Sequence, residues 1–153
     1  MLEMFADLNL SEEASTYIAR GLRSLADVDG LSNSELALVE QFEREASIGP
    51  TSGKDFSVDG GGPLAAGAER EAFLSSLLLM SLADGRVSTR EEQMIDAMAT
   101  ELGIDADRRM HLDREARKYL LRHFAGVQVF RDQAVSIGRS LGLTPAEIAS
   151  VLD

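Results

Sequence analysis

Two short acidic turns in this sequence carry side chains that could bind a metal ion. Asp84-Gly85 is followed, after two further residues, by a Ser-x-x-Glu sequence that ends at Glu91, and a similar turn at residues 27–30 precedes Glu35. Because Asp84 and Glu91 are separated by one tight turn, their carboxylates could converge on a single cation. Carboxylate oxygens are the ligands that hard divalent cations such as Ca²⁺ and Mg²⁺ prefer. We therefore predict a site for Ca²⁺, or for another divalent cation, at this turn.

The spacing of this turn differs from that of an EF-hand. Residues 84–91 match the second half of an EF-hand loop, with Glu91 in the position of the bidentate ligand. The first and third positions of the loop would be Met80 and Leu82, whose side chains cannot bind the ion. In the N-terminal turn, Glu35 falls one position early. Neither turn is therefore a proper EF-hand loop.

The same residues also have a purely structural explanation. Residues 31–35, 87–91 and 143–147 share one pattern, in which an apolar residue is followed by Ser or Thr, two further residues and Glu. This pattern is the capping box, in which the hydroxyl accepts the N3 amide hydrogen and the Glu reaches back to the N-cap amide. A Gly that ends the preceding helix, with an Asp beside it, accounts for the remaining residues. Metal binding and helix capping both stay open from the spacing alone.

The chemistry-bearing residues elsewhere in the chain do not favour catalysis. The sequence has no cysteine and only two histidines, His111 and His123, which excludes thiol catalysis, Cys-ligated metals and a multi-histidine cage. Asp107, His111 and Glu115 share one helical face, which we interpret as a solvated, salt-bridging surface. There is no nucleophile–base pair and no convincing acid–base pair. We predict a protein that is not an enzyme and uses no organic cofactor.

Composition limits the classes of partner. The 153 residues include 26 acidic and 15 basic side chains, a net charge of −11. A strongly acidic chain repels phosphate backbones, which disfavours nucleic acid. The longest uncharged apolar-rich run, residues 72–83, is shorter than the roughly 20 residues that a membrane span needs. The first residues lack the basic and apolar regions of a signal peptide. We expect a cytoplasmic protein that binds a protein partner or forms a homo-oligomer, without inserting into membranes.

The negative charge is unevenly distributed along the chain. Residues 1–60 carry 12 acidic and 4 basic side chains, residues 61–106 carry 8 and 3, and residues 107–153 carry 6 and 8. The last segment is therefore slightly basic, and most of its basic side chains lie between Arg108 and Arg122. We interpret them as a helix face that pairs with acidic neighbours in the same fold. The alternative is a surface that recruits a partner.

Helical periodicity predicts the elements that must position these residues. Apolar side chains recur every three or four residues, and no stretch alternates as a strand would. Residues 68–82 are apolar nearly all round, which is typical of a central core helix. Seven helices are expected, beginning after Ser11, after Ser32, at about Ala68, after Ser88, at about Asp107, near Gly126 and at Thr144. The fourth and sixth should end at Gly103 and Gly142, and Pro145 occupies the favoured first position of the last.

One segment interrupts this pattern. Residues 47–67 hold six of the 13 glycines and two of the three prolines, which is typical of a long loop. The helical pair in residues 1–46 is too small to stand alone, so we expect it to dock onto a main bundle formed by residues 68–153. The predicted fold class is all-α. The predicted architecture is a single compact domain, residues 1–153, of about seven helices with a Gly-rich loop after the second.

Three stretches of the sequence resemble the TerB-like family. Residues 81–92 contain Ala-Asp-Gly-Arg-Val-Ser-Thr-Arg-Glu, close to the family hallmark Ala-Asp-Gly-x-hydrophobic-Ser-x-x-Glu, and residues 101–104 add the Leu-Gly-hydrophobic helix end. Residues 138–144 are similar to the close of that domain. The family includes the tellurite-resistance protein TerB and the N-terminal domain of the membrane-anchored co-chaperone DjlA. The resemblance implies an all-helical TerB-like bundle with two related acidic turns and a stress-related role as a sensor or scaffold.

The resemblance also assigns metal ligands to particular positions. Members of the family have been linked to divalent metal binding, and the matching carboxylates here are Asp84 and Glu91, with Asp29 and Glu35 from the N-terminal copy. The N-terminal copy has one inserted residue, so Asp27 is an alternative to Asp29. The family's usual second Ala-Asp-Gly, downstream of the first, is missing from the sixth expected helix.

Overall fold

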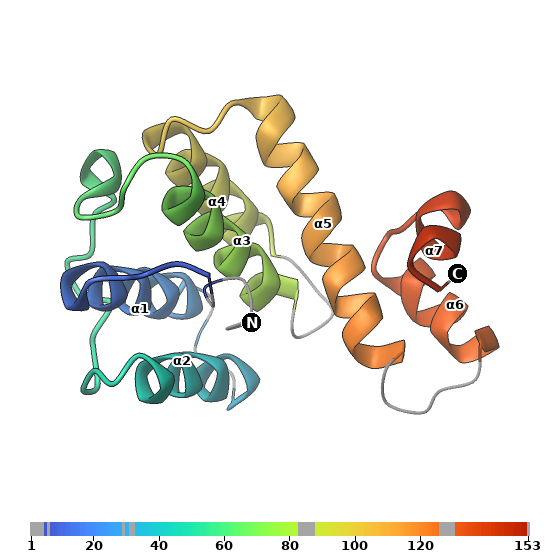
Figure 1. Ribbon diagram of the computed structural model, residues 1–153, viewed down its shortest axis with the longest axis horizontal. Helices are drawn as coiled ribbons and strands as arrows, with labels where there is room; N and C mark the ends of the chain where they lie inside the picture. The colour runs from blue at the N-terminus through green and yellow to red at the C-terminus, as the bar shows by residue number, and fades with distance from the viewer. Residues whose placement is uncertain are drawn as a thin grey trace. The chain divides into compact units, whose positions relative to one another are not determined.

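The computed structural model describes residues 5, 7–28, 30, 33–82, 88–125 and 131–152, and within these residues every regular element is helical. The chain divides into two compact units, Met1–Ala106 and Asp107–Asp153. Figure 1 shows the helices in chain order. Their bounds are α1 Glu12–Ala26, α2 Asn33–Glu45, the short 3₁₀ helix η2 Asp59–Gly61, α3 Ala68–Leu82, α4 Thr89–Glu101, α5 Ala106–Ala125, α6 Arg131–Ser140 and α7 Pro145–Leu152.

The first unit is built around α3. Ten of its 15 residues are buried, as the nearly uniform apolar sequence predicts. α3 packs against both α1 and α4, and α1 also packs against α2. The largest fully buried side chains of this unit come from all four helices: Ile18, Leu22, Leu25, Val39, Phe42, Phe73, Leu74, Leu77, Met80 and Ile95. The apolar stripes predicted for the first two helices therefore do face a core.

Helix ends follow the capping chemistry of the sequence. Ser11 caps α1 by accepting a hydrogen bond from the amide of Ala14 at 3.1 Å. Gly103 ends α4 with φ +77°, and the two backbone bonds from residues 103 and 104 close a Schellman motif. Gly142 ends α6 in the same way with φ +76°. Because only glycine adopts this conformation without a steric penalty, these residues fix where the helices stop.

The connection between α2 and α3 contains no long helix, but it packs against the helices of the first unit. It contains only the 3₁₀ turn η2, in agreement with the predicted loop. Figure 1 shows it rising from the end of α2 past α1 before it reaches α3. Phe56 from this connection packs edge-on against Tyr17 of α1 and Phe73 of α3. The loop is therefore part of the folded unit rather than a free linker.

The second unit contains α5 from Asp107, α6 and α7. A small apolar cluster joins them: Leu121, Ala134, Leu141, Leu143 and Ile148. At Gly138 in α6, an added Cβ would lie 2.6 Å from Ile148 of α7. The missing side chain therefore lets these two helices approach closely.

The observed bounds agree with the sequence-based helices to within a residue or two wherever the structure describes the chain. The third helix was predicted at residues 68–82, which is where α3 lies. The proposed start of the sixth helix near Gly126 falls outside the described residues, and α6 is described from Arg131. A single domain of residues 1–153 stays a prediction. No helix in the described ranges has both the length and the apolar character needed to cross a membrane.

Candidate functional site

The two glutamates predicted as metal ligands both lie in the first turn of a helix and are both buried. Glu35 is in the first turn of α2 and is 4% exposed, and Glu91 is in the first turn of α4 and is 8% exposed. Glutamate is rarely buried to this extent, because removing a carboxylate from water is costly unless a charge or hydrogen bond compensates. A helix N-terminus lowers part of that cost, since its exposed amides carry partial positive charge.

The aspartates of the same turns cannot be placed. Asp29 and Asp84 fall outside the described residues. Asp27, the alternative to Asp29, is the C-cap of α1 and is exposed. Among the side chains that the structure describes, no group of three or more His, Asp or Glu residues is arranged to hold a metal ion. The convergence of Asp84 with Glu91 therefore remains a prediction.

The capping interpretation of the second turn is confirmed for Ser88. Its backbone is extended, with φ −73° and ψ 156°, and its hydroxyl accepts a hydrogen bond from the amide of Glu91 at 3.1 Å. This contact uses the backbone of Glu91, so it leaves the direction of the carboxylate unspecified. Ser32, the expected cap of α2, lies outside the described residues.

The third capping box shows the complete reciprocal arrangement. The amide of Glu147 donates to the hydroxyl of Thr144 at 3.1 Å, and the amide of Thr144 donates to Glu147 Oε1 at 3.0 Å. Arg114 of α5 forms two hydrogen bonds with the same carboxylate. The hydrogen bond from Arg114, helped by Thr144, lowers the pKa of Glu147 to about 2. This Glu is only partly buried, unlike Glu35 and Glu91.

The basic segment of the chain is largely paired within the second unit. On α5, Arg117 contacts Asp113 at 2.9 Å, Arg109 contacts Asp113 at 3.6 Å, and Lys118 contacts Glu115 at 3.4 Å. This agrees with the prediction of a salt-bridging helix face. The arginines also reach the turn between α6 and α7, where Arg114 bonds to the carbonyl of residue 142 at 2.8 Å and Arg117 to that of residue 141. Cations at a helix C-terminus are stabilising there.

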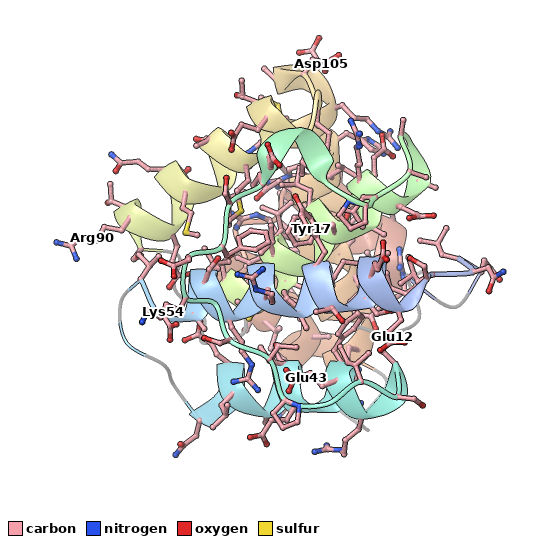
Figure 2. The ribbon with its side chains drawn as sticks, turned by 90° about the vertical axis from the view of Figure 1, so that its left-hand side faces the viewer. Glu12, Tyr17, Glu43, Lys54, Arg90 and Asp105 are labelled. Carbon is pink, nitrogen blue, oxygen red and sulfur yellow. The ribbon has the colours of Figure 1, made fainter. Side chains whose placement is uncertain are left out.

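A buried polar node in the first unit was not predicted from the sequence. Glu43 of α2 is 4% exposed and forms an ion pair with Arg23 of α1 at 2.7 Å. Its Oε2 also accepts the amide of Thr51 at 2.8 Å and the hydroxyl of Thr51 at 2.6 Å. The node, defined as Arg23, Glu43 and Thr51, thus joins two helices to the long connection. Figure 2 shows Glu43 on α2, beside the connection.

The charge on Glu43 is favoured by this node. Burial raises the pKa of Glu43, but the hydrogen bonds from Arg23 and Thr51 outweigh it, and the pKa lies below its ordinary value of 4.5. A signal for its burial was present in the sequence. Glu43 follows Phe42 and lies four residues after Val39, so it falls on the apolar stripe of α2. Thr51 offered no comparable signal, because its position depends on how the loop folds back.

Two side chains of α1, Tyr17 and Arg20, donate hydrogen bonds to the long loop and also line an open hollow at the surface. Arg20 donates to the carbonyls of Ser52 and Lys54 at 3.1 and 3.0 Å, and Tyr17 donates to the carbonyl of Val58. Burial raises the pKa of Tyr17 to about 12, with the nearby acidic side chains adding to the rise and Arg70 opposing it. The hollow has a volume of about 830 Å³ and is lined by Ser11, Glu12, Glu13, Thr16, Tyr17, Arg20 and Pro63.

The structure defines this chain as an all-helical protein, and the comparisons with known proteins assign it to no family. No protein-family model matches the sequence, and no similar curated protein or solved structure was found. Membership of the TerB-like family therefore rests on the sequence motifs at residues 81–92, 101–104 and 138–144. It stays a prediction.

Proposed function

We propose that this chain is a cytoplasmic, non-enzymatic helical module of TerB-like type that binds a divalent cation, Ca²⁺, at its acidic turns. The observation that supports the proposal is the burial of Glu35 and Glu91, the two glutamates whose helices follow an Asp-Gly turn. Glu147 occupies the same position in the third capping box, which has no Asp-Gly turn before it, and its side chain is only partly buried. Burial of the carboxylate thus accompanies the acidic turn rather than the capping box alone.

A calcium ion would supply a cation beside each buried carboxylate. Hard cations take oxygen ligands from carboxylates, backbone carbonyls and water, and this cysteine-free chain offers mainly oxygen. The proposed ligands are Asp84 with Glu91, and Asp29 with Glu35. Binding at such a turn would join the end of one helix to the start of the next. This is how the module would act as a sensor or scaffold in a stress-related assembly.

Calorimetric titration of the chelator-treated protein with Ca²⁺ tests the proposal. Wild-type protein should bind the ion, and Glu91→Gln or Asp84→Asn should weaken binding at least tenfold because each removes an anionic ligand. Glu92→Gln is the matched control, since Glu92 is the next residue of α4 and is exposed. Absence of binding, or equal binding by all four proteins, would contradict the proposal.

The alternative is an interaction module that needs no metal, and the distribution of charge supports it. Residues 1–106 carry 20 acidic and 7 basic side chains, a net charge of −13, whereas residues 107–153 have a net charge of +2. This division coincides with the boundary between the two compact units. A basic protein partner would be attracted to the first unit. A complex that survives an excess of chelator but dissociates in high salt would favour this alternative over the metal site.

A further inference from the structure

The segment that follows α2 lies along α1 and is held mainly by polar contacts. We define the strap as residues 49–58. Its first half is fastened by Thr51, which bonds to Glu43, and by two carbonyls that accept hydrogen bonds from Arg20. Its end is fastened at Val58, whose carbonyl accepts the hydroxyl of Tyr17. Figure 2 shows this segment passing in front of α1, with Tyr17, Glu43 and Lys54 labelled.

The strap buries little apolar surface of its own. Val58 is its one fully buried side chain, and Phe56 is partly buried against the rings of Tyr17 and Phe73. Six other residues of the strap are exposed, namely Gly49, Pro50, Ser52, Lys54, Asp55 and Ser57. Burial of apolar surface is the main source of stability, so the strap contributes few of the interactions that hold the helices together.

Two features of the strap's backbone show that it must fit closely against α1 in the observed conformation. Gly53 lies so near α1 that an added Cβ would be 2.4 Å from the backbone nitrogen of Ser24. Asp55 has φ +60°, in the left-handed region that costs a non-glycine residue free energy. The polar contacts must therefore offset both the ordering of the strap and this local strain.

The core of the helices beneath the strap is formed mainly by their own side chains, and the strap adds Val58 and the ring of Phe56 to its edge. α3 is buried along most of its length, and Leu74, Leu77 and Met80 are fully buried within the first unit. Segments with few buried apolar contacts open at lower free energy than the core elements of the same fold. The strap and the helices differ strongly in this respect.

We propose that the strap is a conformational device that opens as a unit while α1, α3 and α4 stay folded, and that the node of Arg23, Glu43 and Thr51 holds it closed. Opening breaks the contacts of Thr51 with Glu43 and frees the guanidinium of Arg20 from its two carbonyl acceptors. It uncovers the face of α1 that carries Arg20 and Ser24, beside the hollow at the start of that helix. The node thereby controls access to this surface.

Hydrogen exchange of the full-length protein, followed residue by residue by NMR, tests the proposal. The amide of Thr51 reports on opening, because it donates a hydrogen bond to Glu43 of α2 that opening breaks, whereas the amides of Lys54 and Phe56 bond to acceptors within the strap. The amides of Leu77 and Met80 report on the core. The amide of Thr51 should exchange at least tenfold faster than the core amides. Exchange of Thr51 and the core amides at one common rate would overturn the proposal, because the strap would then open only with global unfolding.

Two variants act on the strap from opposite sides. Glu43→Gln weakens the node, and Gly53→Ala pushes the strap away from α1 without touching Glu43. Each should speed exchange of the Thr51 amide by about tenfold and leave the core amides unchanged. Glu45→Gln is the control for charge, since Glu45 is exposed at the end of the same helix. If Glu43→Gln does not fold, Gly53→Ala decides alone, and equal acceleration of strap and core would overturn the proposal.

Discussion

At the scale of single residues, Glu147 illustrates how one carboxylate can fasten two helices. It completes the capping box of α7 and also binds Arg114 of α5. Gln can also accept the Thr144 amide in a capping box, so Glu147→Gln removes mainly the charge that strengthens the hydrogen bonds from Arg114, an effect of about 1 kcal/mol. The variant should therefore lower the free energy of unfolding by about 1 kcal/mol, measured by urea denaturation. Glu115→Gln, which removes a single contact with Lys118, should cost less than about 0.5 kcal/mol.

The lowered pKa of Glu147 predicts that the stability of the folded protein depends on pH in the acidic range. Because the pKa of Glu147 is about 2 in the folded protein and 4.5 ordinarily, its charged form is bound more tightly in the folded state. Its contribution is fully present above pH 4.5 and is lost as the pH falls from 4.5 towards 2. The difference in stability between wild type and Glu147→Gln should shrink over this range. A difference that stays constant from pH 5 to pH 2 would contradict the assigned role.

The raised pKa of Tyr17 predicts that stability changes with pH in the opposite direction, so that it decreases as the pH rises into the alkaline range. Burial raises its pKa from 10 to about 12, so the neutral phenol is favoured and its contribution to stability is present below pH 10. That contribution is lost as the pH rises from 10 to 12. In Tyr119→Phe, whose one tyrosine is Tyr17, tyrosinate absorbance should titrate near pH 12. A midpoint near 10, with circular dichroism showing a folded chain, would contradict this expectation.

Sequence patterns predicted some of these residues and missed others for a physical reason. The caps at Ser11, Ser88 and Thr144 depend on local backbone geometry within three residues, so spacing was sufficient. Glu43 and Thr51 bind one another across eight residues, through a loop that folds back on a helix. The charge and spacing of these residues in the sequence do not predict that the loop folds back onto the helix.

At the scale of elements, substitutions at two glycines that both have room for a side chain test where α4 ends. An added Cβ would meet nothing within 4 Å at either Gly49 or Gly103, but only Gly103 has a left-handed backbone. Gly103→Ala should therefore lower the free energy of unfolding by about 1 kcal/mol. Gly49→Ala should be neutral or stabilising, because it reduces the entropy of the unfolded chain. Equal effects in thermal or urea denaturation would contradict the Schellman end of α4.

The same contrast explains which elements were predictable. The ends of α3 and α7 follow from an apolar run and from Pro145, both of which act through the helix's own backbone. The strap could be predicted only as a loop. Its course along α1 depends on Gly53 fitting against Ser24, a contact between segments about 30 residues apart.

At the scale of the whole molecule, the charge imbalance separates into two parts with different explanations. In the second unit, Arg109, Arg114, Arg117 and Lys118 are used in its own fold, where they pair with Asp113, Glu115 and Glu147. The first unit keeps a net charge of −13, and two of its glutamates are buried at the starts of α2 and α4. The burial of these two glutamates is the basis of the proposed cation site.

Calcium titration of wild-type protein beside Glu91→Gln and Glu92→Gln tests this account most directly. The two variants make the same change of charge at adjacent positions of α4, one buried and one exposed. We predict saturable binding to the wild type and to Glu92→Gln, with affinity at least tenfold weaker for Glu91→Gln. Binding that is absent from the wild type, or that is weakened equally by both changes, would contradict the account.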